Sequence, residues 1–332
     1  MFKKKSFLGK LWLKNTNRNQ YKQYKWESKN YQLHELSLFL TGEDRLNTTE
    51  KIKAFSSTNK ILNINHSGNI GDIIYALPTI KKIHELTGIQ INLYLKLGQP
   101  RVLPQYMSHP LGNVMLNKKM VEMLSPLISS QTYIGKCEVY DNQFIHMNLD
   151  IFRSQAIPLD KANIARWCGY ITGVTPELWK SWITVTPDKK YQNNIVIARS
   201  ERYRNASINY SFLKKYNNLV FIGIKSEYDD LLKSVPGLEW KQVADFLELA
   251  QIIAGCKFFI GNQSFPFSIA EGLKVPRVLE AYYEMPNVIP EGENAYDFFF
   301  QEHFESLVHQ LDANKRIVIA RRNDEAISSL MY

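Results

Sequence analysis

The 332-residue chain contains few cysteines and no long apolar segment. Its three cysteines, Cys137, Cys168 and Cys256, are widely spaced, without a C-x-x-C pair or a histidine pair at metal-binding spacing. This spacing argues against a disulfide framework and a structural zinc site, and a reducing cytoplasm is its simplest setting. No apolar run reaches about 18 residues, so we expect no membrane-spanning helix. We also expect no secretory signal, because the N-terminus lacks an apolar core segment.

Positive charge is concentrated at one end of the chain. The formal net charge is +9, and residues 1–30 hold nine Lys or Arg against one acidic residue. That segment therefore carries +8, which leaves about +1 for the rest of the chain. A nearly neutral body is not typical of a nucleic-acid-binding protein.

The basic arm also contains apolar residues that can form one helical face among lysines, namely Phe7, Leu8, Leu11 and Trp12. This composition is typical of a segment that lies on an anionic membrane surface. A disordered basic tail is an equally good interpretation, because the apolar face is short. After the arm, residues 31–45 predict one helix packed on the body, and residues 46–58 predict a polar linker.

Residues 61–80, I-L-N-I-N-H-S-G-N-I-G-D-I-I-Y-A-L-P-T-I, organise the rest of the chain. A short apolar strand leads into a turn with Gly68, Asn69 and Gly71, and Asp72 follows at the start of an apolar helical pattern. Strand, glycine turn and helix form the opening unit of an α/β nucleotide-binding domain. We expect the glycines to adopt positive φ and to let a ligand approach the backbone.

Asp72 has two interpretations. It can cap the helix, since Asp is favoured there and complements the helix dipole. It can also serve as a general base, because open α/β sheets keep their sites at the carboxyl ends of the strands. From the pattern alone, capping is the commoner role. Pro78 lies well inside the helical pattern and should kink the helix or end its first part.

The segment G-N-I-G-D-I-I-Y-A-L-P, residues 68–78, resembles the N-terminal motif of the heptosyltransferase-type glycosyltransferases, glycosyltransferase family nine. With a second motif, the resemblance covers the two halves of roughly residues 58–312. It implies a GT-B fold, an α/β architecture of two Rossmann-like domains that face each other across a cleft. The division it implies is a basic arm with a helix (1–57), an acceptor domain (58–185), a nucleotide-sugar donor domain (186–312) and a C-terminal tail (313–332).

The second motif is F-I-G-N-Q-S-F-P-F-S-I-A-E-G-L-K-V-P-R-V-L-E, residues 259–280. It resembles the family segment G-x-D-S/T-G-x-x-H-L-A-A-A-x-G-x-P. Three positions depart from it: Gln263 replaces Asp, Phe265 replaces Gly and Ser268 replaces His. The resemblance implies that Ser264 and free backbone N–H groups at a helix start bind the donor diphosphate, so no metal or other cofactor is expected.

The same motif supplies further donor-site candidates. Asn262 and Gln263 lie in its turn, and Phe265 could stack on a nucleotide base or close the pocket. Glu271 could reach a ribose hydroxyl, as an acidic residue does in related GT-B enzymes, although a surface glutamate is the commoner situation. Glu227 fits the acidic position that the family places near the ribose, but a glutamate that starts a helix is ordinary as well.

Three arginines follow the strand expected at residues 195–198, within R-S-E-R-Y-R-N. Arginine forms bidentate pairs with phosphate oxygens, so Arg199, Arg202 and Arg204 can form a diphosphate clamp at this strand end. The alternative is a solvated charge run balanced by Glu201.

The remaining pattern predicts strands at 89–95, 133–139, 144–149, 219–224 and 258–260, and helices at 118–127, 159–172 and 245–256, with a last helix near residue 304. Asp150 ends an apolar run and is a weak site candidate. Lys96, Arg101 and His109 could face an acceptor, although such residues are more often simply solvated.

Taken together, these features predict a metal-independent, inverting glycosyltransferase of hexosyl- or heptosyltransferase type. Its donor would be a nucleotide-sugar, and its acceptor a hydroxyl of a cell-surface glycan or a lipid-linked molecule. It would act in the cytoplasm or at the inner face of the cell membrane. Two alternatives stay open: an inactive GT-B protein that binds nucleotide or glycan, and a nucleotide-sugar epimerase. Dehydrogenase chemistry is disfavoured, because the turn lacks G-x-G-x-x-G.

Overall fold

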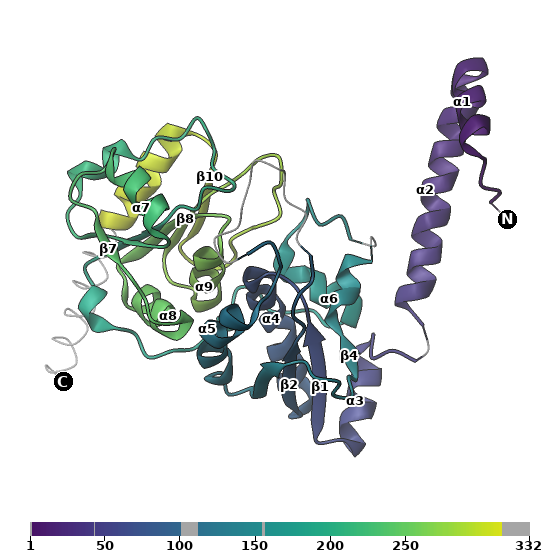
Figure 1. Cartoon of the computed structure of the whole chain (residues 1–332), viewed down its shortest axis with the longest axis horizontal. Helices are drawn as coiled ribbons and strands as arrows, with labels where there is room; N and C mark the ends of the chain where they lie inside the picture. The colour runs from purple at the N-terminus through teal and green to yellow at the C-terminus, as the bar shows by residue number, and fades with distance from the viewer. Residues whose placement is uncertain (1, 43, 101–111, 155–156, 314–332) are drawn as a thin grey trace, which may run out of the picture.

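The computed structural model describes residues 2–42, 44–100, 112–154 and 157–313. Figure 1 shows two α/β units that lie against each other and a helical hairpin beside them. Two residues suggested for acceptor contacts, Arg101 and His109, lie outside the described residues, as does the tail from 314 on. Within the described ranges, no helix is long and apolar enough to cross a bilayer.

The N-terminal unit contains a four-stranded parallel sheet in the order β3-β2-β1-β4. Ile64 of β1 lies opposite Leu93 of β2 on one side and Met147 of β4 on the other. Because the strands are parallel, their carboxyl ends meet at one edge, where the β1–α4 turn begins. The elements are β1 (Ile61–His66), β2 (Gln90–Leu95), β3 (Ile134–Val139), β4 (Met147–Asn148), α4 (Ile70–Thr87) and α5 (Lys118–Ser129).

Helix α4 follows the predicted apolar pattern. Ile73, Ile74, Leu77 and Ile80 are all fully buried. The helix runs past Pro78 to Thr87, so of the two expected effects of this proline, a kink or an end of the first part, the second does not occur. It stops at Gly88, which adopts the left-handed conformation with φ 67°.

Residues 46–58 do not form the predicted linker, because α3 spans Thr49–Thr58. The side chain of Thr48 caps the helix by accepting the N–H of Lys51. Ile52 is buried, and the half-buried Phe55 packs against the same apolar core. One inward residue per turn was enough to attach a segment whose composition is otherwise polar.

The segment that follows β3 is less regular than predicted. The strand expected at 144–149 is reduced to β4, and a short 3₁₀ helix, η1 (Leu149–Arg153), follows it directly. The helix expected at 159–172 begins later, as η2 (Ile164–Arg166) and α6 (Trp167–Thr172).

The C-terminal unit contains a six-stranded parallel sheet in the order β10-β9-β8-β5-β6-β7. β5 lies between β6 and β8, and its four residues are all buried. The strands are β5 (Ile195–Ala198), β6 (Leu219–Ile222), β7 (Glu239–Lys241), β8 (Phe258–Asn262), β9 (Arg277–Glu280) and β10 (Ala295–Phe298). The helices are α7 (Lys225–Leu232), α8 (Phe246–Gly255), α9 (Phe265–Leu273) and a last one at 301–313, with short 3₁₀ helices η3 (Lys189–Tyr191) and η4 (Ser211–Lys215).

Helices from the two units pack directly on each other, α4 on α9 and α5 on α8. A single apolar core contains side chains of both sheets, Leu62 and Ile64 of β1 as well as Val196 of β5. The carbonyl of Gly272 accepts the N–H groups of Trp182 and Ile183 from the connecting segment. The halves therefore share one core along this seam.

The basic arm folds as a helical hairpin of α1 (Phe7–Thr16) and α2 (Arg18–Leu40). Its second helix includes most of the segment that was expected to pack on the body. That expectation holds only at the end of the helix, where Leu40 packs against the body core. Figure 1 shows the rest of the hairpin (purple) standing away from the sheets, and Leu33 and Leu38 are exposed.

Candidate functional site

The β1–α4 turn places Asp72 in the first turn of α4, as its third residue. Its Oδ2 atom accepts the backbone N–H of Asn69, the N-cap residue, at 3.1 Å. The carboxylate therefore satisfies one donor of the helix start and complements the helix dipole. Asp72 thus makes the contact that the capping interpretation requires.

Arg153 connects Asp72 to a second carboxylate. One guanidinium nitrogen lies 2.9 Å from Oδ2 of Asp72, and the other lies 2.9 Å from Oδ1 of Asp150. Asp150 also accepts the backbone N–H of Ser67, so it holds the first residue after β1. The structure thereby joins the carboxyl ends of β1 and β4 through one shared cation.

These contacts leave part of Asp72 open. Within the described residues, its hydrogen bonds to Asn69 and Arg153 all use Oδ2. The side chain is 18% exposed, so Oδ1 can meet a ligand from solvent. A carboxylate with one oxygen fixed and one open is a suitable positioned base.

The backbone conformation of the two glycines in the turn differs from the predicted one. Neither Gly68 nor Gly71 adopts positive φ, so that prediction was wrong. A Cβ at Gly68 would collide with the Arg153 guanidinium and lie 2.8 Å from Oδ2 of Asp72, which explains the glycine by close approach. At Gly71 a Cβ would meet no atom within 4 Å.

His66 lies fully buried beneath this turn. Its Nδ1 accepts the N–H of Gly68 at 2.9 Å, so the neutral ring carries its proton on Nε2. Burial is the main cause that lowers the pKa of His66, to about 4, with Arg153 acting in the same direction and Asp150 and Asp72 opposing it. The imidazole is therefore neutral at physiological pH.

Several buried polar atoms around the turn have no hydrogen-bond partner within the described residues. They include Nε2 of His66 and Oδ1 of Asn65. Buried polar atoms are normally paired, so an unpaired group of this kind favours a site that takes a polar ligand or water. The β1–α4 turn thus combines unpaired buried polar atoms with the carboxylates of Asp72 and Asp150.

On the donor side, α9 begins after Ser264, its N-cap residue. Pro266 has no N–H, and Phe267 donates its N–H to the carbonyl of Ser264 at 3.1 Å. The helix start therefore offers fewer backbone donors than the motif suggested. Phe265 is half-buried and packs on Phe246, with ring centroids 4.4 Å apart, rather than standing free for a base.

Asn262 and Gln263 use their side chains within the protein. The Asn262 amide is buried and donates to the carbonyls of Ser200 and Arg202, so it fixes the arginine loop. Gln263 accepts the N–H of Tyr282 and donates to the carbonyl of Met285 and to Asn287, as a support for the following loop. Their contacts assign both residues to loop support.

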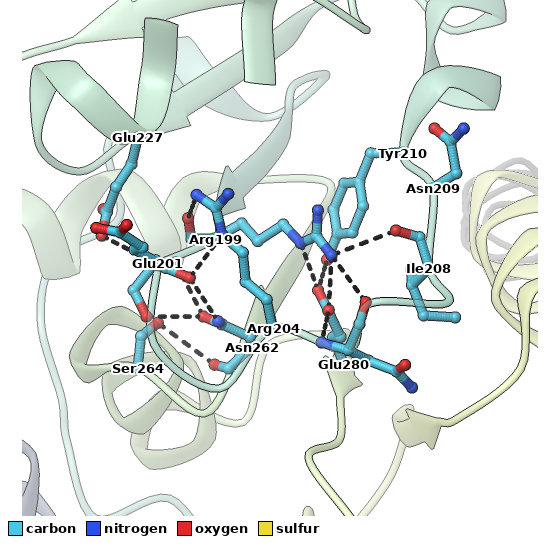
Figure 2. A network of polar contacts seen from close by, with 12 residues as sticks. Arg199, Glu201, Arg204, Ile208, Asn209, Tyr210, Glu227, Asn262, Ser264 and Glu280 are labelled. Carbon is cyan, nitrogen blue, oxygen red and sulfur yellow. Dashed lines mark hydrogen bonds and ion pairs between the residues drawn. The ribbon is translucent and has the colours of Figure 1, made fainter. Parts of the chain in front are cut away.

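Arg199 lies at the end of β5, but its guanidinium turns to Glu280, as Figure 2 shows. Its Nε and Nη2 atoms bond both oxygens of this fully buried carboxylate, at 2.7 and 2.8 Å. The Tyr210 hydroxyl donates to the same carboxylate, and the guanidinium lies over its ring. A buried carboxylate needs such a partner, so Arg199 has a structural role and does not point to Ser264.

The other two arginines of the loop differ in exposure and pairing. Arg204 pairs with Asp230 at 2.5 Å and donates to the carbonyl of Ser200. Arg202 is half-buried and lies over the ring of Tyr203, 4.7 Å from its centroid, without a carboxylate partner within the described residues. Of the three arginines expected to form a diphosphate clamp, Arg202 is therefore the one without a carboxylate partner within the described residues.

The two acidic donor candidates are both constrained. Glu227 accepts the N–H of Glu201 at 2.9 Å, and burial raises its pKa. Glu271 is not a surface residue, as the commoner interpretation had it, because it is buried between Arg277 and Lys274. Desolvation in this cluster lowers the pKa of Lys274 to about 8.

Sequence reasoning missed Arg153 and His66. Arg153 follows Asp150 by three residues, a spacing that permits an ion pair within one helical turn, and this was the signal available. Nothing in the sequence pattern marks His66 as buried beneath Gly68. The part of the chain that the structure describes contains no group of three His, Cys, Asp or Glu placed to hold a metal ion.

Comparison with solved structures identifies the fold class. The ADP-heptose lipopolysaccharide heptosyltransferase II of E. coli matches 78% of this chain and 100% of its own, with a TM-score of 0.52 at 13% identity. A glycosyl transferase family 9 protein of Veillonella parvula matches 72% of this chain and 85% of its own, with a TM-score of 0.45 at 13% identity. The iron-containing dodecameric glycosyltransferase TibC of enterotoxigenic E. coli matches 72% of this chain and 62% of its own, with a TM-score of 0.46 at 13% identity.

This chain has the α/β GT-B fold of the heptosyltransferase structures, as the two sequence motifs predicted. No protein-family model matches the chain, and no curated protein matches it by sequence.

Proposed function

We propose that the protein is an inverting glycosyltransferase that moves a sugar from a nucleotide-sugar to a hydroxyl group. One observation carries this proposal: Asp72 sits at the carboxyl end of β1 in a GT-B fold, with Oδ2 held by Arg153 and Oδ1 open. The acceptor would be a cell-surface glycan or a lipid-linked precursor. The solved heptosyltransferase of E. coli is an ADP-heptose enzyme, so ADP-heptose is the first donor to test.

In this mechanism Asp72 takes the proton of the acceptor hydroxyl on Oδ1. The acceptor oxygen then attacks the anomeric carbon from the face opposite the nucleotide. The bond between the anomeric carbon and the diphosphate oxygen breaks, and its electron pair stays on the diphosphate. Negative charge grows on the departing diphosphate, and Arg202 and the N-terminus of α9 are the groups that would stabilise it. Such a preorganised contact contributes about 2–4 kcal/mol in the transition state. Because protein groups carry this charge, we expect chelation by EDTA to leave transfer unchanged.

The test is a transfer assay with Asp72→Asn, which keeps the volume of the side chain but removes the base. We expect a loss of roughly 10²–10⁴-fold in kcat. Asp141→Asn is the matched control, since Asp141 is an exposed aspartate of the same unit. Near-normal transfer by Asp72→Asn, with folding checked by circular dichroism, would refute the assignment of the base.

A second function is favoured by the donor side. Arg199, Asn262, Gln263 and Glu271 are engaged in contacts within the protein, and Pro266 removes a backbone donor. A GT-B protein that binds nucleotide or glycan without turnover would fit such a site. Calorimetric binding of a nucleoside diphosphate, combined with no transfer and no hydrolysis across a broad donor panel, would support this function over catalysis. Conversion of a donor sugar without any acceptor would instead indicate an epimerase.

A further inference from the structure

The hairpin of α1 and α2 has a small core of its own. Leu13 and Tyr24 are buried between its helices. The Tyr24 hydroxyl accepts the backbone N–H of Lys5 at 3.0 Å, and the Phe2 ring stacks on the Tyr24 ring. These contacts fold the arm back on itself, so the basic N-terminal segment is held along α2.

Large apolar side chains remain uncovered on this hairpin. Phe7 and Trp12 of α1 are 78% and 66% exposed, and Leu8 and Leu11 between them are exposed as well. Residues three and four positions apart are neighbours on a helix surface, so the pairs Phe7–Leu11, Leu8–Leu11 and Leu8–Trp12 connect these four side chains into one apolar stripe. Trp26 of α2 is 67% exposed. A contiguous apolar surface of this kind marks an interaction site.

The charge around the stripe indicates what kind of partner covers it. Residues 2–30 contain nine Lys or Arg and a single acidic residue, Glu27. Two copies of such a surface repel each other, whereas an anionic surface attracts it. Tryptophan favours the boundary between head groups and acyl chains, because its ring is apolar and its N–H is polar.

We propose that the α1–α2 hairpin binds an anionic lipid bilayer. The stripe Phe7–Trp12 enters the head-group region, and the flanking lysines contact lipid phosphates. The basic residues of α2 lie in its first half, from Arg18 to Lys29, and the chain reaches the body from the other end. A helix of 23 residues is about 34 Å long, so the hairpin can hold the body at a distance from the surface. This inference does not depend on the proposed glycosyltransferase activity.

The test is sedimentation of the full chain with vesicles of phosphatidylcholine, alone or with 30% phosphatidylglycerol. We expect binding to the anionic vesicles that weakens as salt rises, and little binding to the neutral ones. Lys3→Gln/Lys4→Gln/Lys5→Gln should lower the partition coefficient by roughly 100-fold. The matched control removes three exposed lysines of the C-terminal unit, Lys189→Gln/Lys214→Gln/Lys233→Gln, and should leave binding unchanged.

The apolar stripe has its own variant, Phe7→Ser/Trp12→Ser, which should lower binding at least tenfold. These side chains are exposed, so the body should stay folded. Absence of binding to anionic vesicles, or equal loss in the control, would overturn the inference. So would a concentration-dependent dimer in the absence of lipid that Phe7→Ser/Trp12→Ser abolishes, because it would make a second copy the partner. Transfer to a soluble acceptor should not change in these variants, which separates this test from that of the activity.

Discussion

Asp72 accepts a 2.9 Å hydrogen bond from Arg153, a residue 81 positions further along the chain. The same guanidinium bonds Asp150, so one positive charge serves two carboxylates. Arg153 therefore decides how Asp72 is oriented and how much negative charge the turn can hold.

Removal of the Arg153 guanidinium should lower both the stability of the fold and the rate of sugar transfer. Arg153→Gln leaves Asp72 and Asp150 near each other without a shared partner, and a hydrogen bond to a charged group contributes about 1.5–3 kcal/mol. We expect the free energy of unfolding in urea to fall by that amount and kcat to fall with it. Arg166→Gln, which breaks a more exposed pair with Glu291, is the control and should cost less than about 1 kcal/mol. Equal effects in the two variants would contradict this role of Arg153.

The two glycines of the turn should respond in opposite directions to the same change. A Cβ at Gly68 meets the Arg153 guanidinium and the His66 ring, so Gly68→Ala should destabilise by about 1–3 kcal/mol. Gly71 is in the first turn of α4 with open space around it, so Gly71→Ala should be neutral or stabilise by up to about 1 kcal/mol. Urea unfolding of both variants measures this. A stabilising Gly68→Ala would show that Arg153 moves aside without cost.

Stability should fall in acid because of His66. Its pKa is about 4 in the folded protein and about 6.5 in the unfolded chain, so the unfolded chain binds the proton first. The contribution is fully present above about pH 6.5 and is lost as pH falls toward 4, by up to about 3 kcal/mol. Urea unfolding between pH 7.5 and 4.5 should show this slope.

The matched variant for this pH effect is His66→Asn, which can still accept the Gly68 N–H but does not titrate in this range. Its stability should depend less on pH than that of the wild type. His146, whose pKa is also lowered by burial, provides the comparison, because His146→Asn should change the slope less at this more exposed site. An unchanged slope in His66→Asn would mean that other groups cause the acid sensitivity.

Substitutions of Arg199 and Arg202 should have different effects, the first on the stability of the fold and the second on nucleotide binding. Arg199→Met leaves Glu280 buried and unpaired, which should destabilise the fold by about 3–5 kcal/mol. Arg202→Gln should change stability by less than about 0.5 kcal/mol but weaken nucleoside diphosphate binding roughly 10–100-fold. Calorimetry with ADP, GDP, UDP and dTDP measures the binding. If Arg202→Gln binds like the wild type, the diphosphate does not reach this loop.

The sequence patterns that predicted structure well were those set by local chemistry. The buried strand β5, the apolar face of α4 and the stop at Gly88 each follow from spacing or backbone preference within a few residues. The sequence pattern did not predict helix α3, because Ile52 is the one residue of this helix that is buried. The leucines of α2 predicted a face packed on the body, whereas Leu33 and Leu38 are exposed in the structure.

Site prediction was limited by long-range pairing. The two sequence motifs located the β1–α4 turn and the start of α9. They could not show which side chains there already form hydrogen bonds or ion pairs within the protein. Arg199 and Glu280 lie 81 residues apart, as do Asp72 and Arg153, and no local pattern connects such pairs. Three arginines within six residues therefore resembled a clamp, although two of them, Arg199 and Arg204, are paired with carboxylates.

The packing of α4 on α9 has a consequence for how the molecule can be dissected. Ile64 of β1 and Val196 of β5 belong to one apolar core, so cutting the chain between the sheets would expose a large apolar surface on each fragment. The N-terminal unit should therefore not fold as an autonomous module, whereas the C-terminal unit also has a core of its own, which includes Ile195, Phe221 and Phe258. Opening the seam between α4 and α9 would require disrupting this shared interior, so we expect the two helices to stay in contact when a ligand binds.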